Sequence, residues 1–404
     1  MKVTRLETIH LAEHPHILWV QVYTDDGLVG LGETFGGAEA VSAYVHESVA
    51  PYLLGEDPLQ IDRHAKALTG YLGFRSSGVE TRGNSAVDIA LWDLFGQAAD
   101  QPIYQLLGGL SRDRIRVYNT CAGYSYVRQR LSRYRIANWE LPRGGGEGPY
   151  EDLDAFLHRA GALAESLLDQ GITGMKIWPL DPYAEASGGM YISGPDLTKA
   201  LEPFRKIRSA VGDQMDVMVE MHSLWNLPAA LRLARALEEF NPFWYEDPIK
   251  MDSLGSLAEF ARGTRVPVCA SETLGSRWAF RDLLELKAIG VVMLDLSWVG
   301  GLSEAKKIAG MAEAYHLPVA PHDCTGPVVL TASVHLSLNA VNALIQEFVR
   351  AFYYGWYRDL VTDLPQIKSG YINPPSGPGL GTRLQPGLLN RADAAVRRSD
   401  RDKA

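Results

Sequence analysis

The chain separates into two stretches by its pattern of hydrophobic and polar positions. Near the start, two apolar β-like runs, 17–22 and 28–34, flank a Thr-Asp-Asp-Gly turn, which predicts a hairpin whose glycine takes a positive φ. Over residues 38–73 the period becomes helical, and residues 85–98 form a strongly amphipathic helical pattern. We therefore predict an α+β domain over residues 1–112.

From residue 113 onward, short apolar runs alternate with helical windows. The runs that predict strands are 115–119, 174–178, 216–221, 243–246, 266–271, 291–295, 318–322 and 343–348. The helical windows between them are 153–170, 196–211, 227–240, 280–289 and 303–315. Eight strand-helix units over about 250 residues indicate a closed barrel of parallel strands. The predicted fold class is therefore α/β: a (β/α)8-type barrel over residues 113–365 with an N-terminal α+β capping domain, completed by a C-terminal segment, 366–404, that returns to it.

One connection does not fit this rhythm. The stretch 121–151 is rich in Gly and Arg and too long for an ordinary strand-to-helix loop, so we expect an insertion that folds over the barrel mouth. It contains a basic segment, 128–135. We interpret this segment as a solvated loop or a contact for an anionic substrate rather than a nucleic-acid site.

Composition excludes several classes of function. Hydrophobic residues make up 46% of the chain and charged residues 22%, values typical of a soluble globular protein. The formal net charge of −9 argues against nucleic acid or an anionic membrane as a partner. Three scattered cysteines, Cys121, Cys269 and Cys324, predict a reducing compartment. The first residues contain no apolar stretch typical of an export leader, and no apolar run is long enough to span a membrane, so we expect neither export nor membrane insertion. We therefore expect a cytoplasmic protein.

Carboxylates close three consecutive predicted strands. Glu220, Glu246 and Glu272 lie at the ends of the third, fourth and fifth strands, on the face where barrel proteins carry their reactive groups. Three carboxylates that converge there cannot all stay ionised without a cation. Mg²⁺, with Mn²⁺ as a possible substitute, suits such an all-oxygen ligand set, whereas zinc favours His and Cys. The alternative for each glutamate alone is a surface carboxylate at a loop edge.

Two histidines also lie at predicted strand ends. Asp295 and His322 close neighbouring strands, so we expect a pair in which the carboxylate orients the imidazole and prepares it as a general base. His222 lies two residues beyond Glu220, and strand alternation would direct both side chains the same way. His222 then assists the departure of a leaving group, or alternatively serves as a fourth, nitrogen ligand.

Three further residues are candidates for the site. Lys176 and Trp178 share a face of the second predicted strand. An inward lysine serves as a base, as an anchor for a substrate carboxylate or as a counter-ion for the glutamates; we favour counter-ion and anchor. Glu347, in the eighth predicted strand, could hydrogen-bond to an enolate oxygen if protonated, with a plain carboxylate at the barrel rim as the alternative.

These residues resemble the enolase superfamily in its mandelate racemase-like subgroup. Intervals of 26, 26, 23 and 27 residues separate Glu220, Glu246, Glu272, Asp295 and His322, which is similar to that family's metal triad followed by an Asp/His pair. The helix at 86–96 and the Leu-Leu-Gly-Gly at 106–109 resemble its capping domain. The resemblance covers nearly the whole chain.

The resemblance implies abstraction of the proton next to a carboxylate, with Mg²⁺ holding the enolate. Trp178 stands where racemases of the subgroup carry a second lysine, and Glu220-x-His222 is similar to the Asp-x-His of acid-sugar dehydratases. Our hypothesis is elimination of water from an aldonate or aldarate to give a 2-keto-3-deoxy acid, with His322 as base and His222 as acid. The alternatives are a cycloisomerase or epimerase that uses the same enolate, and a non-catalytic sugar-acid-binding protein.

Substrate recognition in this family resides in capping-domain loops and barrel-end residues. We expect it here around 34–37 and 74–77, with Arg75, Trp178, Lys176 and Trp298 as candidate contacts and Arg82 as a further cation near the mouth. The resemblance also implies a symmetric homo-oligomer, an octamer or a dimer.

Overall fold

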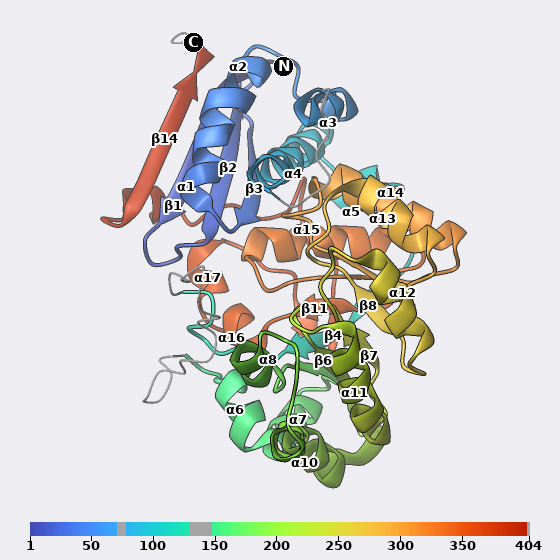
Figure 1. Ribbon diagram of the computed structural model, residues 1–404. Helices are drawn as coiled ribbons and strands as arrows, with labels where there is room; N and C mark the ends of the chain where they lie inside the picture. The colour runs from blue at the N-terminus through green and yellow to red at the C-terminus, as the bar shows by residue number, and fades with distance from the viewer. Residues whose placement is uncertain (71–77, 129–147, 402–404) are drawn as a thin grey trace.

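The computed structural model describes residues 1–70, 78–128 and 148–401. A capping domain lies above a barrel of parallel strands (Figure 1), so the predicted fold class is confirmed. The cap contains one antiparallel sheet in the order β14-β1-β2-β3. Its strands are β1 (Val3–Leu11), β2 (Ile17–Thr24), β3 (Val29–Phe35) and β14 (Ala394–Asp400).

The helices of the cap cover one face of this sheet (Figure 1). They are α1 (Ala38–Tyr44), α2 (Ala50–Leu53), α3 (Ile61–Thr69), α4 (Val79–Ala99) and α5 (Ile103–Leu106), with a π-helical turn at Val45–Val49 between α1 and α2. Helix α4 packs directly on β3 because Gly30 and Gly32 carry no side chain. A Cβ atom would lie 2.1 Å from the Ala90 carbonyl oxygen at Gly30 and 1.8 Å from the Ala86 carbonyl oxygen at Gly32.

The barrel strands follow the predicted runs closely. They are β4 (Ile115–Thr120), β5 (Gly174–Ile177), β6 (Asp216–Glu220), β7 (Trp244–Glu246), β8 (Val268–Ala270), β9 (Val291–Leu294), β10 (Val319–Pro321) and β11 (Gln346–Phe348). Neighbours pair in parallel from β4 to β10, and β11 pairs with β4. A parallel bridge between Val319 and Ala343 closes the ring between β10 and β11.

The crossover helices surround this ring. They are α6 (Asp152–His158), α7 (Ala160–Asp169), α8 (Asp181–Ser187), α9 (Gly194–Ala200), α10 (Glu202–Val211), α11 (Leu227–Leu237), α12 (Leu254–Arg262), α13 (Ser276–Glu285), α14 (Gly301–Ala314) and α15 (Pro327–Asn339), followed by α16 (Arg350–Tyr353) and α17 (Tyr357–Leu360). Two predicted windows are each split into two helices. Pro203 lies in the first turn of α10, which suits a helix start and not a helix interior, and Arg159 has a non-helical φ of −139° between α6 and α7.

The barrel interior is filled by side chains and is not a pore. Tyr118, Met218, Trp244, Met293 and Ala320 are buried together inside the ring. Reactive groups are therefore confined to the carboxyl ends of the strands, where the connecting loops and the cap meet.

The C-terminal segment contacts both domains. β12 (Ile367–Lys368) and β13 (Tyr371–Ile372) form a hairpin, and β13 pairs with barrel strand β4. The backbone N–H of Leu380 then donates to Asp93 of α4 at 2.8 Å, and β14 pairs with β1 along the cap sheet. The tail thus completes the cap, as predicted, but first adds strands to the barrel; the boundaries at 112 and 365 stay predictions.

Polar contacts join the cap to the barrel on the side of β3. Glu33 accepts a hydrogen bond from the backbone N–H of Val329, at the start of α15, at 2.9 Å. Thr34 donates to the carbonyl oxygen of Ser297 at 2.9 Å. These bonds bring the end of β3 against the loop that follows β9 and the first turn of α15.

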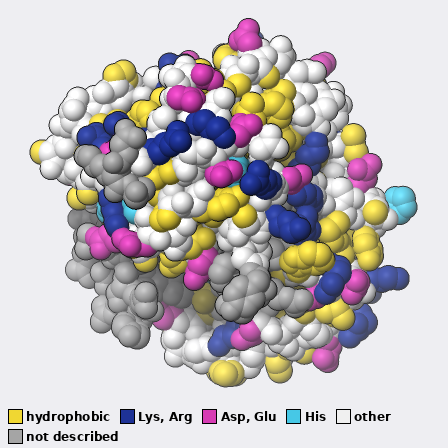
Figure 2. Space-filling model, turned by 90° about the horizontal axis from the view of Figure 1, so that it is seen from above, with side chains coloured by type: hydrophobic (Ala, Val, Ile, Leu, Met, Phe, Trp, Pro, Cys, Tyr) yellow, Lys and Arg dark blue, Asp and Glu magenta, His cyan; other side chains and the backbone are white. Residues whose placement is uncertain are grey.

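Seen from above, basic and acidic side chains lie intermingled on the face that the cap presents, with hydrophobic side chains among them (Figure 2). Among the described residues of this face, such a mixture does not form the continuous basic surface that nucleic acid binding favours. Among the described residues, no helix combines the length and the apolar character that crossing a bilayer requires.

Candidate active site

The three predicted glutamates meet at the carboxyl ends of the barrel strands. Glu220 and Glu246 are the last residues of β6 and β7, and Glu272 lies two residues beyond the end of β8. One oxygen atom from each carboxylate lies within 4.8 Å of the other two. Glu220 and Glu246 are buried, whereas the side chain of Glu272 is 16% exposed. The cluster is therefore open on one side.

Lys176 lies beneath this cluster as its counter-ion. Its Nζ atom lies 3.2 Å from Glu220 and 2.8 Å from Glu347, and it contacts Glu246 at short range. The lysine side chain is only 2% exposed. Burial lowers the pKa of Lys176, but the surrounding carboxylates outweigh burial and hold it well above its usual range. This geometry supports the counter-ion role that we favoured and disfavours the role of a base.

One lysine does not balance the acidic charge of the cluster. Burial and the neighbouring Glu220 hold the pKa of Glu246 well above its usual range, and burial also raises the pKa of Glu272. The Oε2 atom of Glu220 makes an ion pair with Lys176 at 3.2 Å but no hydrogen bond among the described residues. An all-oxygen donor set with excess negative charge and a buried oxygen that lacks a hydrogen bond fits a hard divalent cation such as Mg²⁺.

The predicted Asp/His pair forms beside the glutamates. Asp295 and His322 directly follow β9 and β10, and the Oδ2 atom of Asp295 lies 2.7 Å from Nδ1 of His322. Asp295 is fixed in turn by the backbone N–H and hydroxyl of Ser297, at 2.7 and 2.5 Å. The second ring nitrogen of His322 lies 3.0 Å from Glu272. Burial lowers the pKa of His322, but Glu272, Glu347 and Asp295 together raise it to about 10.

Trp298 covers this imidazole. Its ring stacks on His322, with 5.6 Å between ring centroids and 27° between planes. The indole N–H donates to the carbonyl oxygen of Phe35 in the cap at 2.8 Å, and the guanidinium of Arg82 lies 5.0 Å from the centroid of the same ring. We predicted Trp298 as a substrate contact; its observed contacts place it between the cap and His322.

His222 reaches the site by a different route from the one predicted. The strand ends at Glu220, so alternation along the strand does not orient His222. Instead His222 and Ser223 adopt left-handed backbone conformations with φ of 48° and 57°, and the backbone N–H of His222 donates to Glu220 at 2.7 Å. The imidazole lies at the same cluster, and its side chain is 27% exposed.

A second Asp/His pair forms here that the sequence did not reveal. The Oδ2 atom of Asp181, the first residue of α8, lies 2.5 Å from Nδ1 of His222. Burial lowers the pKa of His222, but Asp181 and Glu220 raise it to about 9. The available signal was an Asp-Pro pair, typical of a helix start, three residues after Trp178.

Trp178 packs against the other side of His222. The two ring centroids lie 5.7 Å apart with an edge-on angle of 74°, and Phe156 and Tyr126 pack against Trp178. Trp178 is 1% exposed. It therefore contacts the candidate acid directly, and its buried surface leaves little area for a substrate.

Glu347 is a paired anion in this structure. One carboxylate oxygen contacts Lys176 and the hydroxyl of Thr120, and the other accepts a hydrogen bond from the backbone N–H of Asp323 at 3.0 Å. Burial raises the pKa of Glu347, but Lys176 and His322 outweigh burial and lower it. The arrangement favours a structural counter-ion over the protonated donor that we considered.

Of the predicted substrate contacts on the cap and the insertion, some lie outside the described residues and one is paired within the protein. Arg75, the loop 74–77 and most of the insertion lie outside the described residues. Arg128, at the start of the basic segment, pairs with Glu13 of the cap and lies 4.9 Å from the ring centroid of Tyr124. Arg128 is thus engaged within the protein.

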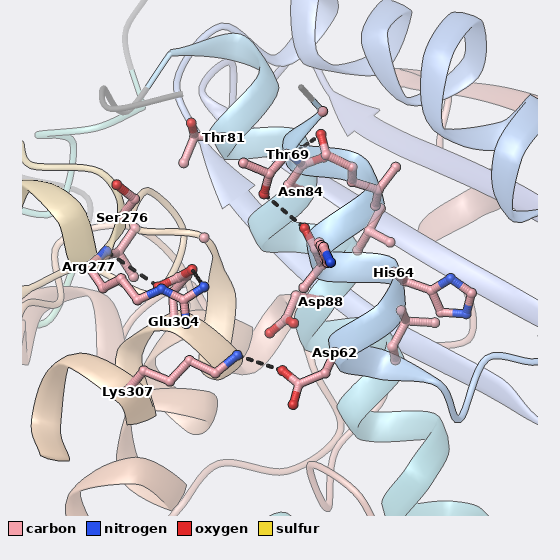
Figure 3. Close-up of a pocket in the computed structure, with 18 of the residues that line it drawn as sticks. Asp62, His64, Thr69, Thr81, Asn84, Asp88, Ser276, Arg277, Glu304 and Lys307 are labelled. Atoms are coloured by element: carbon pink, nitrogen blue, oxygen red, sulfur yellow. Dashed lines mark hydrogen bonds and ion pairs between the residues drawn. The ribbon is translucent and has the colours of Figure 1, made fainter. Parts of the chain in front are cut away.

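A cavity of about 450 Å³ lies apart from this cluster, between helices α3 and α4 of the cap and α13 and α14 of the barrel (Figure 3). Four of its charged groups form two ion pairs. Lys307 lies 2.5 Å from Asp62, and Arg277 lies 3.5 Å from Glu304. This internal pairing gives the cavity no evident preference for a charged ligand, and we assign none to it.

Family models match both parts of the chain. Residues 5–108 match the N-terminal domain of mandelate racemase / muconate lactonizing enzyme. Residues 159–388 match the enolase C-terminal domain-like family. The second match alone covers more than half of the chain.

Curated and solved relatives agree with these matches. The chain is 33% identical to a D-galactonate dehydratase of Ralstonia nicotianae over 396 residues, covering 96% of this chain and 94% of that protein. It is 58% identical to a solved enolase of the mandelate racemase subgroup from Agrobacterium tumefaciens, with full coverage of both chains and a TM-score of 0.89. A solved enolase protein from Sargasso Sea environmental sequencing is 45% identical, with 99% coverage of both chains and a TM-score of 0.87.

Proposed function

Because the chain belongs to the mandelate racemase/muconate lactonizing enzyme family of the enolase superfamily, we propose that it is a Mg²⁺-dependent dehydratase of a sugar acid. The observation that carries this proposal is the pair of imidazoles at one carboxylate cluster. His322 and His222 lie against different members of the cluster, Glu272 and Glu220, and each has its own aspartate. One imidazole can remove a proton while the other delivers one, which elimination of water requires.

In the first half of the reaction, His322 takes the proton from the carbon next to the substrate carboxylate. Asp295 holds Nδ1 of the ring at 2.7 Å, so Nε2 is the nitrogen that accepts the proton. Glu220, Glu246 and Glu272 would hold the divalent cation, which would supply positive charge to stabilise the enolate of the substrate. Lys176, below these carboxylates, keeps them ionised for that task.

In the second half, His222 donates a proton to the hydroxyl on the neighbouring carbon. The carbon–oxygen bond breaks, the electron pair of the enolate forms a carbon–carbon double bond, and the hydroxyl leaves as water. The resulting enol tautomerises to a 2-keto-3-deoxy acid. Trp178 supports this assignment because it stands where the racemases that the chain resembles carry a second lysine, so racemisation with one base on each face lacks that lysine.

We propose a six-carbon aldonate as the first substrate to test, because the curated relative from Ralstonia nicotianae is a D-galactonate dehydratase. Screening of aldonic, aldaric and uronic acids for 2-keto-acid formation tests the assignment. Turnover of at least one acid that stops with a chelator and returns with Mg²⁺, or with Mn²⁺ as substitute, supports it. Absence of turnover across the whole panel contradicts it and leaves a non-catalytic sugar-acid-binding protein.

A cycloisomerase or epimerase is the second candidate, since the same enolate can collapse without loss of water. The mass of the product separates the two. A dehydratase product is lighter than its substrate by one water, and an isomerase product has unchanged mass. We further propose that the enzyme acts in the cytoplasm as a symmetric homo-oligomer, an octamer or a dimer, which light scattering of the purified protein tests.

A further inference from the structure

We infer that Asp181 is a positioning residue that aims His222 at the departing hydroxyl, so that the site contains two Asp/His pairs with separate tasks. The inference rests on the proposed function. It begins from one contact: the Oδ2 atom of Asp181 lies 2.5 Å from Nδ1 of His222. Because Asp181 occupies Nδ1, the other ring nitrogen, Nε2, is left for the substrate.

The surroundings of Asp181 indicate that its side chain serves this contact with His222. Asp181 has 0% exposure, and its second oxygen, Oδ1, has no hydrogen-bond partner among the described residues. A buried carboxylate without partners destabilises the folded protein. His222 is the partner that the structure provides for it, so a residue that served only the stability of α8 would be better replaced by an apolar side chain.

The backbone of His222 is held as firmly as its ring. A positive φ is unfavourable in a residue other than glycine, and both His222 and Ser223 adopt one. The bond from the His222 N–H to Glu220, at 2.7 Å, and the bond from the Ser223 N–H to the Asp247 carbonyl, at 2.8 Å, hold this turn. Strained conformations fixed in this way concentrate at functional sites.

Trp178 restricts the ring from another side. Its indole lies edge-on to the imidazole, with 5.7 Å between centroids. The contact with Asp181 prevents the imidazole from turning within its own plane, and Trp178 limits how far that plane can tilt. The side chain of His222 nevertheless stays 27% exposed, so a substrate can reach the free nitrogen.

The test compares Asp181→Asn with Glu185→Gln. Glu185 is an exposed carboxylate on the same helix, α8, so the control removes the same charge without contact to His222. Two rates are measured in deuterated buffer with a sugar acid that the wild type turns over: 2-keto-acid formation, and deuterium incorporation next to the carboxylate of recovered substrate. Asp181→Ser, a smaller replacement, is run in parallel in case the amide is not accommodated.

We expect Asp181→Asn to slow water loss by about 10²-fold, with KM changed only a few-fold. Deuterium incorporation should persist, because His322 still removes the proton and the enolate returns it. A substrate analogue with fluorine in place of the leaving hydroxyl provides the decisive readout. Fluoride departs without receiving a proton, so the variant should recover most of the wild-type rate on this analogue.

Three results for Asp181→Asn would each overturn the inference while leaving the proposed function standing. They are an equal fall in the rates of exchange and of water loss, no recovery on the fluorinated analogue, and rates like those of Glu185→Gln. A wild type that catalyses neither exchange nor water loss on any sugar acid would instead contradict the proposed function, and the leaving-group task of Asp181 with it.

Discussion

The two sides of the carboxylate cluster are built from similar pairs but supported differently. On the His322 side, the cap participates: Trp298 bonds to Phe35, and Thr34 bonds to Ser297. On the His222 side, the described contacts come from the barrel alone, through Asp181 and Trp178. Formation of the first side therefore depends on how the cap docks, whereas the second side is set by the barrel strands and their loops.

Exposure differs in the same direction. The side chain of His322 is 5% exposed and that of His222 is 27% exposed. A base that removes a proton from carbon works best where water cannot compete. An acid that releases water needs a path for that water to leave. The difference teaches that one cluster can serve two protonation tasks because its two sides are closed to different degrees.

The largest expected effect is the loss of both reaction steps when the metal is removed. Treatment with a chelator should reduce exchange and water loss to background, because both steps depend on the cation that Glu220, Glu246 and Glu272 would hold. Addition of Mg²⁺ should restore both. Rates of deuterium incorporation and 2-keto-acid formation measure the effect, and full activity after exhaustive chelation would contradict the metal assignment.

The second largest effect comes from removing the base, because both proton exchange and water loss depend on it. His322→Asn should lower both exchange and water loss by about 10⁴-fold, since removal of the proton precedes water loss. His316→Asn, at an exposed position, is the matched control and should leave both rates unchanged. Continued deuterium incorporation in His322→Asn would show that another residue is the base.

His222→Asn should produce the opposite pattern with a smaller loss. We expect water loss to fall by about 10²- to 10³-fold while exchange next to the carboxylate continues. The same two rates measure the outcome. If this variant keeps full water loss, the comparison between an acid side and a base side fails.

Trp298 tests the support that the cap gives to the base side. Trp298→Ala removes the ring that stacks on His322 and should slow both steps about 10-fold through a looser imidazole, whereas Trp298→Phe keeps an aromatic face and should lose only a few-fold. Steady-state rates of 2-keto-acid formation distinguish them. Equal activity of Trp298→Ala and wild type would show that the cap does not support the base through Trp298.

The smallest effect concerns stability at the junction of cap and barrel. Burial raises the pKa of Glu33 to about 8, so the unfolded chain releases this proton at lower pH than the folded protein does. The free energy of unfolding should therefore fall as the pH rises from about 5 to about 8, by an amount on the order of a few kcal/mol. Glu33→Gln should flatten this decline in urea midpoints measured across that range; an unchanged slope would contradict it.

Much of this comparison could be predicted from the sequence. Apolar runs located the eight parallel barrel strands, and because strand ends of a parallel barrel share one face, the spacing of Glu220, Glu246 and Glu272 predicted a cluster. The same reasoning predicted the Asp295 and His322 pair, since those residues close adjacent strands. Period and topology suffice where a residue lies in a strand or directly at its end.

Residues beyond the strand ends were harder to place. The orientation of His222 depends on a left-handed turn that strand periodicity does not describe, and Asp181 meets it from the first position of helix α8, 41 residues earlier in the chain. Trp298 was predicted at the site, but its stacking on His322 depends on how the cap docks. Such contacts depend on tertiary packing and leave no periodic signal.

The cap sheet joins strands made at very different times. Arg5 of β1 contacts Asp400 of β14, 395 residues later in the chain, so a ribosome has synthesised the whole barrel before the edge strand of the cap exists. Domains fold as units during synthesis, and the barrel can therefore form before the cap sheet is complete. Since the cap supports the base side of the site, a nascent chain should acquire the His222 side first, and an interrupted chain should bind the metal without efficient proton abstraction.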